Sequence, residues 1–275
     1  MMAIPANFQF TQSNLQDYVE CARRFELRYL QKLKWPAVET EPIADREYHM
    51  RQGAAFHHLI HQYLVGVPAE AISQTAKENP LHDWWESFLR SDILSSLPPQ
   101  RYPETSLSTP IGTYRLLAKY DLIAIEAGQK AVIIDWKTSL KRPKREDLAR
   151  RMQTLVYPYV LAQAGTQLNN GQPLQPEQIE MIYWFAEEPN RPERFSYDAF
   201  QLTQDEQLLD RLIEEISTRT IFELTPDERK CRFCVYRSLC RRGVEAGDFQ
   251  EQQDLEAENG FDLDFNFDQI AEVEF

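Results

Sequence analysis

Two aspartates and a lysine form the pattern in this sequence with the clearest chemical potential. Asp121 interrupts an apolar run, and Asp135 and Lys137 lie two residues apart in the next such run. Residues two apart on a strand leave the same face of a sheet. Because unpaired buried charge is costly, such a group forms an ordinary salt bridge at a sheet rim, binds a metal ion, or faces a cleft.

Phosphodiester hydrolysis is a reaction that uses this combination of side chains. It needs a divalent cation that neutralises the phosphate and lowers the pKa of the attacking water, and Mg²⁺ or Mn²⁺ prefers carboxylate oxygens. Asp121 and Asp135 can hold such an ion. Lys137 can orient or deprotonate the water, or stabilise the charge of the transition state.

The four cysteines form a second group, in which Cys21 is far in sequence from the Cys231-x2-Cys234-x5-Cys240 trio. A cytoplasmic location is expected, since the first residues lack the basic flank and apolar run of a secretory signal. Disulfides are rare in that compartment. Four thiolates suit either a structural Zn²⁺ or an iron–sulfur cluster, and their spacing leaves both open.

The net charge of −13 is concentrated at the C-terminal end. Residues 245–275 hold eleven Asp or Glu and no Lys or Arg, so residues 1–244 carry a net charge of −2. This acidic tail is predicted to be disordered or to dock elsewhere. Basic residues cluster at 23–34, 137–151 and 229–242, with the density that a phosphate-contacting face needs, although solvated helix faces look similar. The expected DNA contacts are Arg23, Arg24, Lys141, Arg142, Lys144 and Arg145.

Hydrophobic periodicity predicts a mixed α/β architecture. Helices are expected over residues 10–33, 47–64, 69–96, 145–164 and 204–219, and strands over 114–125, 131–136, 179–186 and 194–197, with a hairpin turn at 126–128. No apolar stretch approaches the roughly 20 residues of a membrane span. Four segments are expected: a helical region carrying Cys21 and His57 (1–103), a core (104–220), a Cys-rich segment (221–244) and the acidic tail (245–275).

Four short elements resemble the PD-(D/E)xK nucleases, specifically the RecB-like branch. Residues 134–139 (IDWKTS), which follow Asp121, resemble the (D/E)xK element. Residues 53–57 (GAAFH) resemble the G-x-x-x-H element, and residues 153–157 (QTLVY) resemble the Q-x-x-x-Y element. The glycine of the usual G-x-x-D is replaced by Ala118. The resemblance spans residues 10–242.

The resemblance implies a restriction-endonuclease-like fold, a mixed central sheet flanked by helices, with an N-terminal helical segment and a C-terminal Cys-rich staple. It implies that His57, Asp121, Asp135 and the carbonyl of Trp136 coordinate Mg²⁺ or Mn²⁺ and that Lys137 is catalytic. Gln153 and Tyr157 would contact DNA or steady the site. The cysteines resemble the 4Fe–4S staple of RecB-like nucleases, including the CRISPR-associated nuclease of spacer acquisition, which favours a cluster over zinc.

The expected function is therefore a metal-dependent DNA nuclease that acts as an exonuclease on single-stranded or end-containing DNA. Such an enzyme would serve DNA repair, recombination or CRISPR-type defence, with a helicase or integrase-type protein partner and no membrane association. The alternative is a non-catalytic nucleic-acid-binding or interaction module that keeps a structural Cys₄ metal site.

Overall fold

A computed structural model describes residues 4–33, 41–243, 247 and 251. Apart from residues 247 and 251, the predicted acidic tail lies outside the described residues. Within the described ranges, no helix has both the length and the apolarity that crossing a membrane requires.

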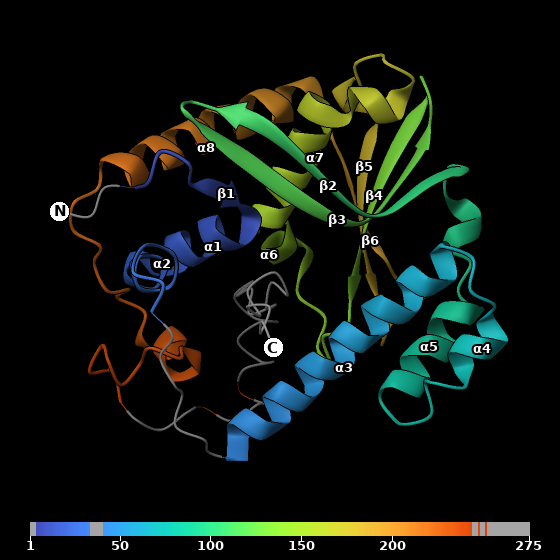
Figure 1. Cartoon of the computed structure of the whole chain (residues 1–275), viewed down its shortest axis with the longest axis horizontal. Coiled ribbons are helices and arrows are strands. Elements are labelled where there is room, and N and C mark those ends of the chain that lie inside the picture. The colour runs from blue at the N-terminus through green and yellow to red at the C-terminus, as the bar shows by residue number, and fades with distance from the viewer. Residues whose placement is uncertain (1–3, 34–40, 244–246, 248–250, 252–275) are drawn as a thin grey trace.

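A six-stranded mixed sheet forms the centre of the fold (Figure 1). Its main path runs β1-β3-β4-β5-β6, and β2 pairs with β3. The β3–β4 hairpin is antiparallel, whereas β4 and β5 run parallel. This arrangement confirms the predicted mixed α/β class. The strands are β1 (Gln9–Thr11), β2 (Gln100–Ile111), β3 (Tyr114–Glu126), β4 (Lys130–Lys137), β5 (Ile179–Phe185) and β6 (Glu193–Ser196).

Helices cover both faces of the sheet, and Figure 1 shows α3, α4 and α5 grouped on the side away from α1 and α8. The helices are α1 (Gln12–Glu20), α2 (Ala22–Phe25), α3 (Glu41–Leu64), α4 (Ala69–Ser73), α5 (Leu81–Arg90), α6 (Arg145–Arg150), α7 (Met152–Ala164) and α8 (Ala199–Thr218). A π-helical turn (Glu26–Leu30) and 3₁₀ segments at Leu94–Ser96, Gly165–Asn169, Pro176–Gln178 and Glu228–Phe233 complete the set.

The two faces of β4 belong to different hydrophobic clusters. Ile133 packs with residues of α1, α7 and α8 in one cluster. Ile134, its neighbour on the strand, packs with residues of α3 and α5 in the other. Because successive side chains alternate across a strand, a strand buried on both faces is apolar throughout. Asp135 and Lys137 at the end of β4 are therefore exceptions, because they are charged residues buried in a strand that is otherwise largely apolar.

Three predicted helices are interrupted. The helix predicted over 69–96 divides into α4, α5 and the 3₁₀ segment at Leu94–Ser96. Cys21 has extended backbone (φ −161°, ψ 104°) and separates α1 from α2. Arg151 is also extended (φ −65°, ψ 140°) and separates α6 from α7. At both positions the following segment starts in a new direction, which no local propensity of Cys or Arg demands. The break at Arg151 starts α7, whose Gln153 contacts the end of β4.

Candidate active site

Asp135 and Lys137 lie on the same face at the end of β4, and both are buried. The Lys137 Nζ atom is 3.0 Å from Asp135 Oδ2. The other carboxylate oxygen, Asp135 Oδ1, accepts a hydrogen bond from Gln153 Nε2 at 2.5 Å. A buried ion pair is tolerated when further hydrogen bonds satisfy the charges, and Gln153 supplies one of them.

Asp121 lies where β3 and β4 stop pairing. The regular pairs begin at Leu122–Ile134 and run toward the hairpin turn, so Asp121 is just beyond them. Its Oδ2 accepts the backbone N–H of Trp136 at 2.8 Å, and its Oδ1 is 3.3 Å from His57 Nδ1. The side chain of Asp121 is 19% exposed, so this carboxylate reaches solvent while Asp135 does not.

His57 reaches the sheet from α3 because that helix approaches it closely. One turn earlier in α3 is Gly53, where an added Cβ would lie 2.9 Å from the Thr138 Oγ1 atom just after β4. Another turn earlier, His49 Nε2 lies 3.0 Å from the Thr138 carbonyl oxygen. The glycine of the G-x-x-x-H element thus has a packing reason, since a larger residue would push the helix from the strand.

The His57–Asp121 pair is ionised around neutral pH. Burial lowers the pKa of His57, but the Asp121 carboxylate more than compensates, and the pKa rises to about 9. Burial raises the pKa of Asp121, but His57 and the Trp136 N–H stabilise its carboxylate, so the net shift is downward. The imidazolium thereby supplies positive charge beside two acids.

Helix α7 supports the site through the two residues of the Q-x-x-x-Y element. Gln153 donates to Asp135, as described above. The Tyr157 ring lies 4.8 Å from that of Tyr120 on β3, and the Tyr120 hydroxyl donates to the Tyr157 carbonyl at 2.9 Å. The Tyr157 hydroxyl accepts from Gln12 Nε2 at 3.2 Å. The structure thus pairs His57 with Asp121 and places both Lys137 and Gln153 against Asp135. The Trp136 N–H of β4 donates to Asp121 of β3 and so joins the two strands.

The sequence did not indicate Gln12, Thr154 or Tyr183 as residues of this region. Thr154 follows Gln153, and Tyr183 pairs with Asp135 across the β4–β5 ladder. None of them carries a charge in an apolar run, which is the signal that identified Asp121, Asp135 and Lys137, and none is a defining residue of the family motifs that added His57, Gln153 and Tyr157.

The predicted DNA-contacting residues differ in their exposure. Arg24 is buried and pairs with Asp17 at 2.7 Å and with Glu20. Arg23 is partly exposed and pairs with Glu26. The structure therefore engages Arg23 and Arg24 in ion pairs within the N-terminal helical segment.

The predicted DNA contacts of the second basic cluster (137–151) are more exposed to solvent. Arg142 pairs with Glu193 at 2.5 Å and stacks over the Phe185 ring at 5.1 Å. Arg145 also pairs with Glu193, at 2.8 Å, but its side chain is 52% exposed. Lys141 is partly buried and Lys144 is exposed. Lys144 and Arg145 are thus the members of the predicted set that face solvent most.

The four cysteines gather where the N-terminal and C-terminal segments meet. The Arg23 N–H donates to the Glu223 carbonyl at 3.0 Å, and the Tyr236 hydroxyl donates to the Leu33 carbonyl at 2.9 Å. Burial, together with the other three thiols, raises the pKa of Cys231 to about 11. All four cysteines are free.

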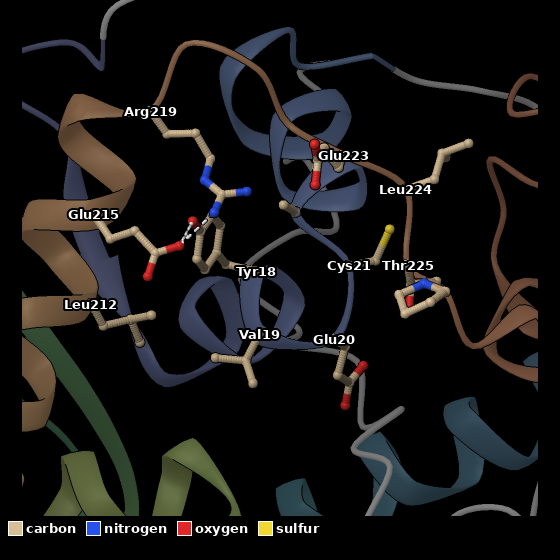
Figure 2. Close-up of a pocket in the computed structure, with 12 residues that line it drawn as sticks. Tyr18, Val19, Glu20, Cys21, Leu212, Glu215, Arg219, Glu223, Leu224 and Thr225 are labelled. Carbon is tan, nitrogen blue, oxygen red and sulfur yellow. Dashed lines mark hydrogen bonds and ion pairs between the residues drawn. The ribbon is translucent and has the colours of Figure 1, made fainter.

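Cys21 also lines a pocket of ≈ 360 Å³ between the α1–α2 corner, the end of α8 and the segment after it. Figure 2 shows Tyr18, Glu215 and Arg219 converging on one side of this pocket. The Tyr18 hydroxyl donates to Glu215 Oε1 at 2.6 Å, and the Arg219 guanidinium lies over the Tyr18 ring at 5.3 Å. These contacts fix the end of α8 against α1.

Neither group is arranged as a ready metal site. In the part of the chain that the structure describes, no three His, Cys, Asp or Glu residues form a group that could hold a metal ion. At the β4 end, the candidate ligands instead pair with one another and with Lys137.

Comparison with known proteins gives a family match over most of the chain. The sequence profile of the PD-(D/E)XK nuclease superfamily matches residues 9–241. A search of curated proteins finds no match.

Among solved structures, similar chains include a candidate exonuclease from Eubacterium rectale, at 12% identity and a TM-score of 0.48, with 90% of this chain and 93% of that chain covered. The structure of SSO0001 is 13% identical with a TM-score of 0.41 and covers 86% of this chain and 87% of that chain.

Proposed function

Since the chain belongs to the PD-(D/E)XK nuclease superfamily, we propose that it is a Mg²⁺- or Mn²⁺-dependent deoxyribonuclease. The observation that carries the proposal is the convergence of Asp121, Asp135 and Lys137 from the neighbouring strands β3 and β4. His57 joins them from α3. An exonuclease acting on single-stranded or end-containing DNA is the form we propose.

The donor set fits a hard divalent cation. Two carboxylates and one imidazole, with the Trp136 carbonyl, are ligands that Mg²⁺ or Mn²⁺ accepts. When bound, the ion neutralises the scissile phosphate and lowers the pKa of the attacking water. Binding by these residues requires His57 and Asp121 to give up their ion pair.

Lys137 supplies the remaining chemistry. Its ammonium group is held at 3.0 Å from Asp135 in a buried environment. A fixed positive charge in a dry site can orient the attacking water and stabilise the charge that develops on the phosphate. Gln153 keeps the Asp135 carboxylate oriented by occupying its second oxygen.

Cleavage of labelled DNA tests this proposal. Wild-type protein should degrade end-labelled single-stranded DNA with Mg²⁺ or Mn²⁺ and not with a chelator present. Asp135→Asn and Lys137→Met should each lower the rate by ~10²-fold or more. Asp210→Asn, an exposed acid on α8, is the matched control and should cut normally.

Further DNA substrates and conditions distinguish the proposed exonuclease from the alternative functions. Closed circular DNA should resist an exonuclease, so its cleavage would contradict that part of the proposal. Tight DNA binding with no cleavage under any metal would instead favour the non-catalytic binding module. Addition of a helicase or an integrase-type protein tests whether such a partner changes the rate.

We also propose a 4Fe–4S cluster on Cys21, Cys231, Cys234 and Cys240. The contacts that bring the N-terminal helices against the Cys-rich segment support it, and four thiols are a complete ligand set. Protein purified without oxygen should contain iron and sulfide and absorb visible light, and Cys21→Ala should lose both. A colourless protein that contains zinc would establish the structural-zinc alternative.

A further inference from the structure

Tyr183 is a buried neighbour of the acid–lysine group to which the proposed chemistry assigns no task. It pairs with Asp135 across the β4–β5 ladder and is fully buried. The Lys137 Nζ atom lies 5.8 Å from the centroid of the Tyr183 ring. This distance is within the range of a cation–π contact, which strengthens when water is excluded.

The hydroxyl of Tyr183 is tied to α7 in a defined direction. The Thr154 hydroxyl donates to the Leu148 carbonyl at 2.5 Å, and it has a single hydrogen to give. The Tyr183 hydroxyl lies 2.7 Å from Thr154 Oγ1, so Tyr183 must be the donor in this bond. One end of the phenol is thus anchored to α7 while its ring lies beside Lys137.

Lys137 needs more than one anchor. A lysine side chain is a flexible four-carbon stem that loses about 2 kcal/mol of rotamer entropy when it is fixed. Its ion pair is with Asp135, which is also a proposed metal ligand. The Tyr183 ring carries no charge and holds no ligand, so its contact with the ammonium group does not compete with metal binding.

We propose that Tyr183 is a positioning residue for Lys137 and that the Thr154 hydroxyl holds Tyr183 in place. This inference rests on the proposed nuclease function, since it assigns a role within that site. It predicts that the two hydroxyl groups act as a single unit in catalysis.

A double-mutant cycle tests this unit. Tyr183→Phe and Thr154→Val should each lower kcat roughly tenfold, because small misplacements of a catalytic group are costly, with KM for single-stranded DNA unchanged. Thr154→Ser keeps the hydroxyl and should restore kcat. The double variant should be no worse than either single variant, because both remove the same contact.

Matched controls separate positioning from stability. Tyr159→Phe removes the hydroxyl of another buried tyrosine, on the α7 side that neighbours Glu206 of α8, and should leave kcat unchanged. Melting temperatures of all variants are compared. Additive losses in the cycle, a wild-type kcat in Thr154→Val, or a loss that follows the melting temperature would each overturn the inference.

An NMR measurement keeps the inference testable if the protein cuts no DNA. The ¹⁵Nζ resonance of Lys137 is assigned by its loss in Lys137→Met. It should move in Thr154→Val and remain in place in Thr154→Ser. If the wild type is inactive and this resonance moves, the nuclease proposal fails and the positioning role stands. An unmoved resonance would overturn the positioning role itself.

Discussion

The carboxylate of Asp121 is bonded to the backbone of the strand that carries Asp135, through the Trp136 N–H at 2.8 Å. Pairing between β3 and β4 ends one residue away, at Leu122 and Ile134. The Asp121 side chain therefore continues the connection between the strands after their backbones have separated. It keeps the two acids in register at the place where the sheet opens.

This bond separates the structural and chemical roles of Asp121. Asp121→Asn keeps an oxygen that can accept from Trp136 but loses the negative charge that pairs with His57, so we expect loss of cleavage together with the loss of unfolding free energy that comes from the ion pair alone. Asp121→Ala leaves the Trp136 N–H without that acceptor and should cost a further ~1–3 kcal/mol. Urea denaturation measures both, and equal stability of the two variants would argue against the bond.

Gly53 should be coupled energetically to Thr138. In Gly53→Ala, the gain in helix propensity of up to about 1 kcal/mol is opposed by the contact with Thr138 Oγ1. Thr138→Ala removes that atom. The double variant should therefore be more stable than the sum of the single changes predicts, by roughly 1 kcal/mol. Thermal denaturation of the four proteins gives this coupling, and strict additivity would refute it.

Arg23 and Arg24 are adjacent in sequence but should behave differently. Removing Arg24 takes away the cation that pairs with the buried carboxylate of Glu20 and one of the two that pair with Asp17, Arg28 being the other, so Arg24→Ala should lower the unfolding free energy by ~3 kcal/mol or more. Arg23→Ala breaks a partly exposed pair and should cost less than ~1 kcal/mol. Denaturant titrations check this difference, and similar losses in both variants would contradict the burial of Arg24.

Lys144 should contribute to DNA binding through phosphate contact. Neutralising it in Lys144→Gln should weaken binding and reduce the slope of log affinity against log salt by about 0.7–1. Arg211→Gln, at an exposed position on α8, serves as the control and should leave the slope unchanged. Fluorescence anisotropy with single-stranded DNA over a range of salt concentrations measures both slopes.

Asp205 should make stability depend on pH in the acid range. Burial raises the pKa of this carboxyl to about 6, from an ordinary value of 3.8. The neutral form therefore contributes stability that is complete below about pH 4 and lost as the pH rises through 6. Relative to Asp205→Asn, the wild type should lose ~1–2 kcal/mol between pH 4 and 7. The exposed Asp210→Asn variant should show a flat difference, and a flat difference for Asp205→Asn would exclude the shift.

The sequence predicted the part of the fold where hydrophobic pattern and structure agree. The runs at 114–125 and 131–136 are apolar and bounded by a glycine turn, and they form the β3–β4 hairpin. β2 was not predicted as a strand of this length because Gln100–Ile111 is mostly polar and contains Pro103 and Pro110. Its strand conformation comes from pairing along nearly the whole of β3.

The candidate site likewise divides into residues that the sequence identified and residues that it did not. Charges in apolar runs identified Asp121, Asp135 and Lys137, and the family resemblance added His57 and Gln153. The contact between His57 and Asp121 depends on how α3 packs, which sequence spacing does not give. Thr154 and Tyr183 carry no unusual signal, because a threonine in a helix and a tyrosine in a buried strand are ordinary residues until their hydroxyls meet.

Three residues within a five-residue stretch of α7 connect to three neighbouring strands. Gln153 bonds to Asp135 on β4, Thr154 to Tyr183 on β5, and the Tyr157 carbonyl to Tyr120 on β3. Helix α7 is thus hydrogen-bonded to all three strands β3, β4 and β5 at this end of the sheet. A shift of α7 would therefore affect contacts with all three strands together, so this helix offers a route by which a bound partner or an engineered change could alter the whole centre at once.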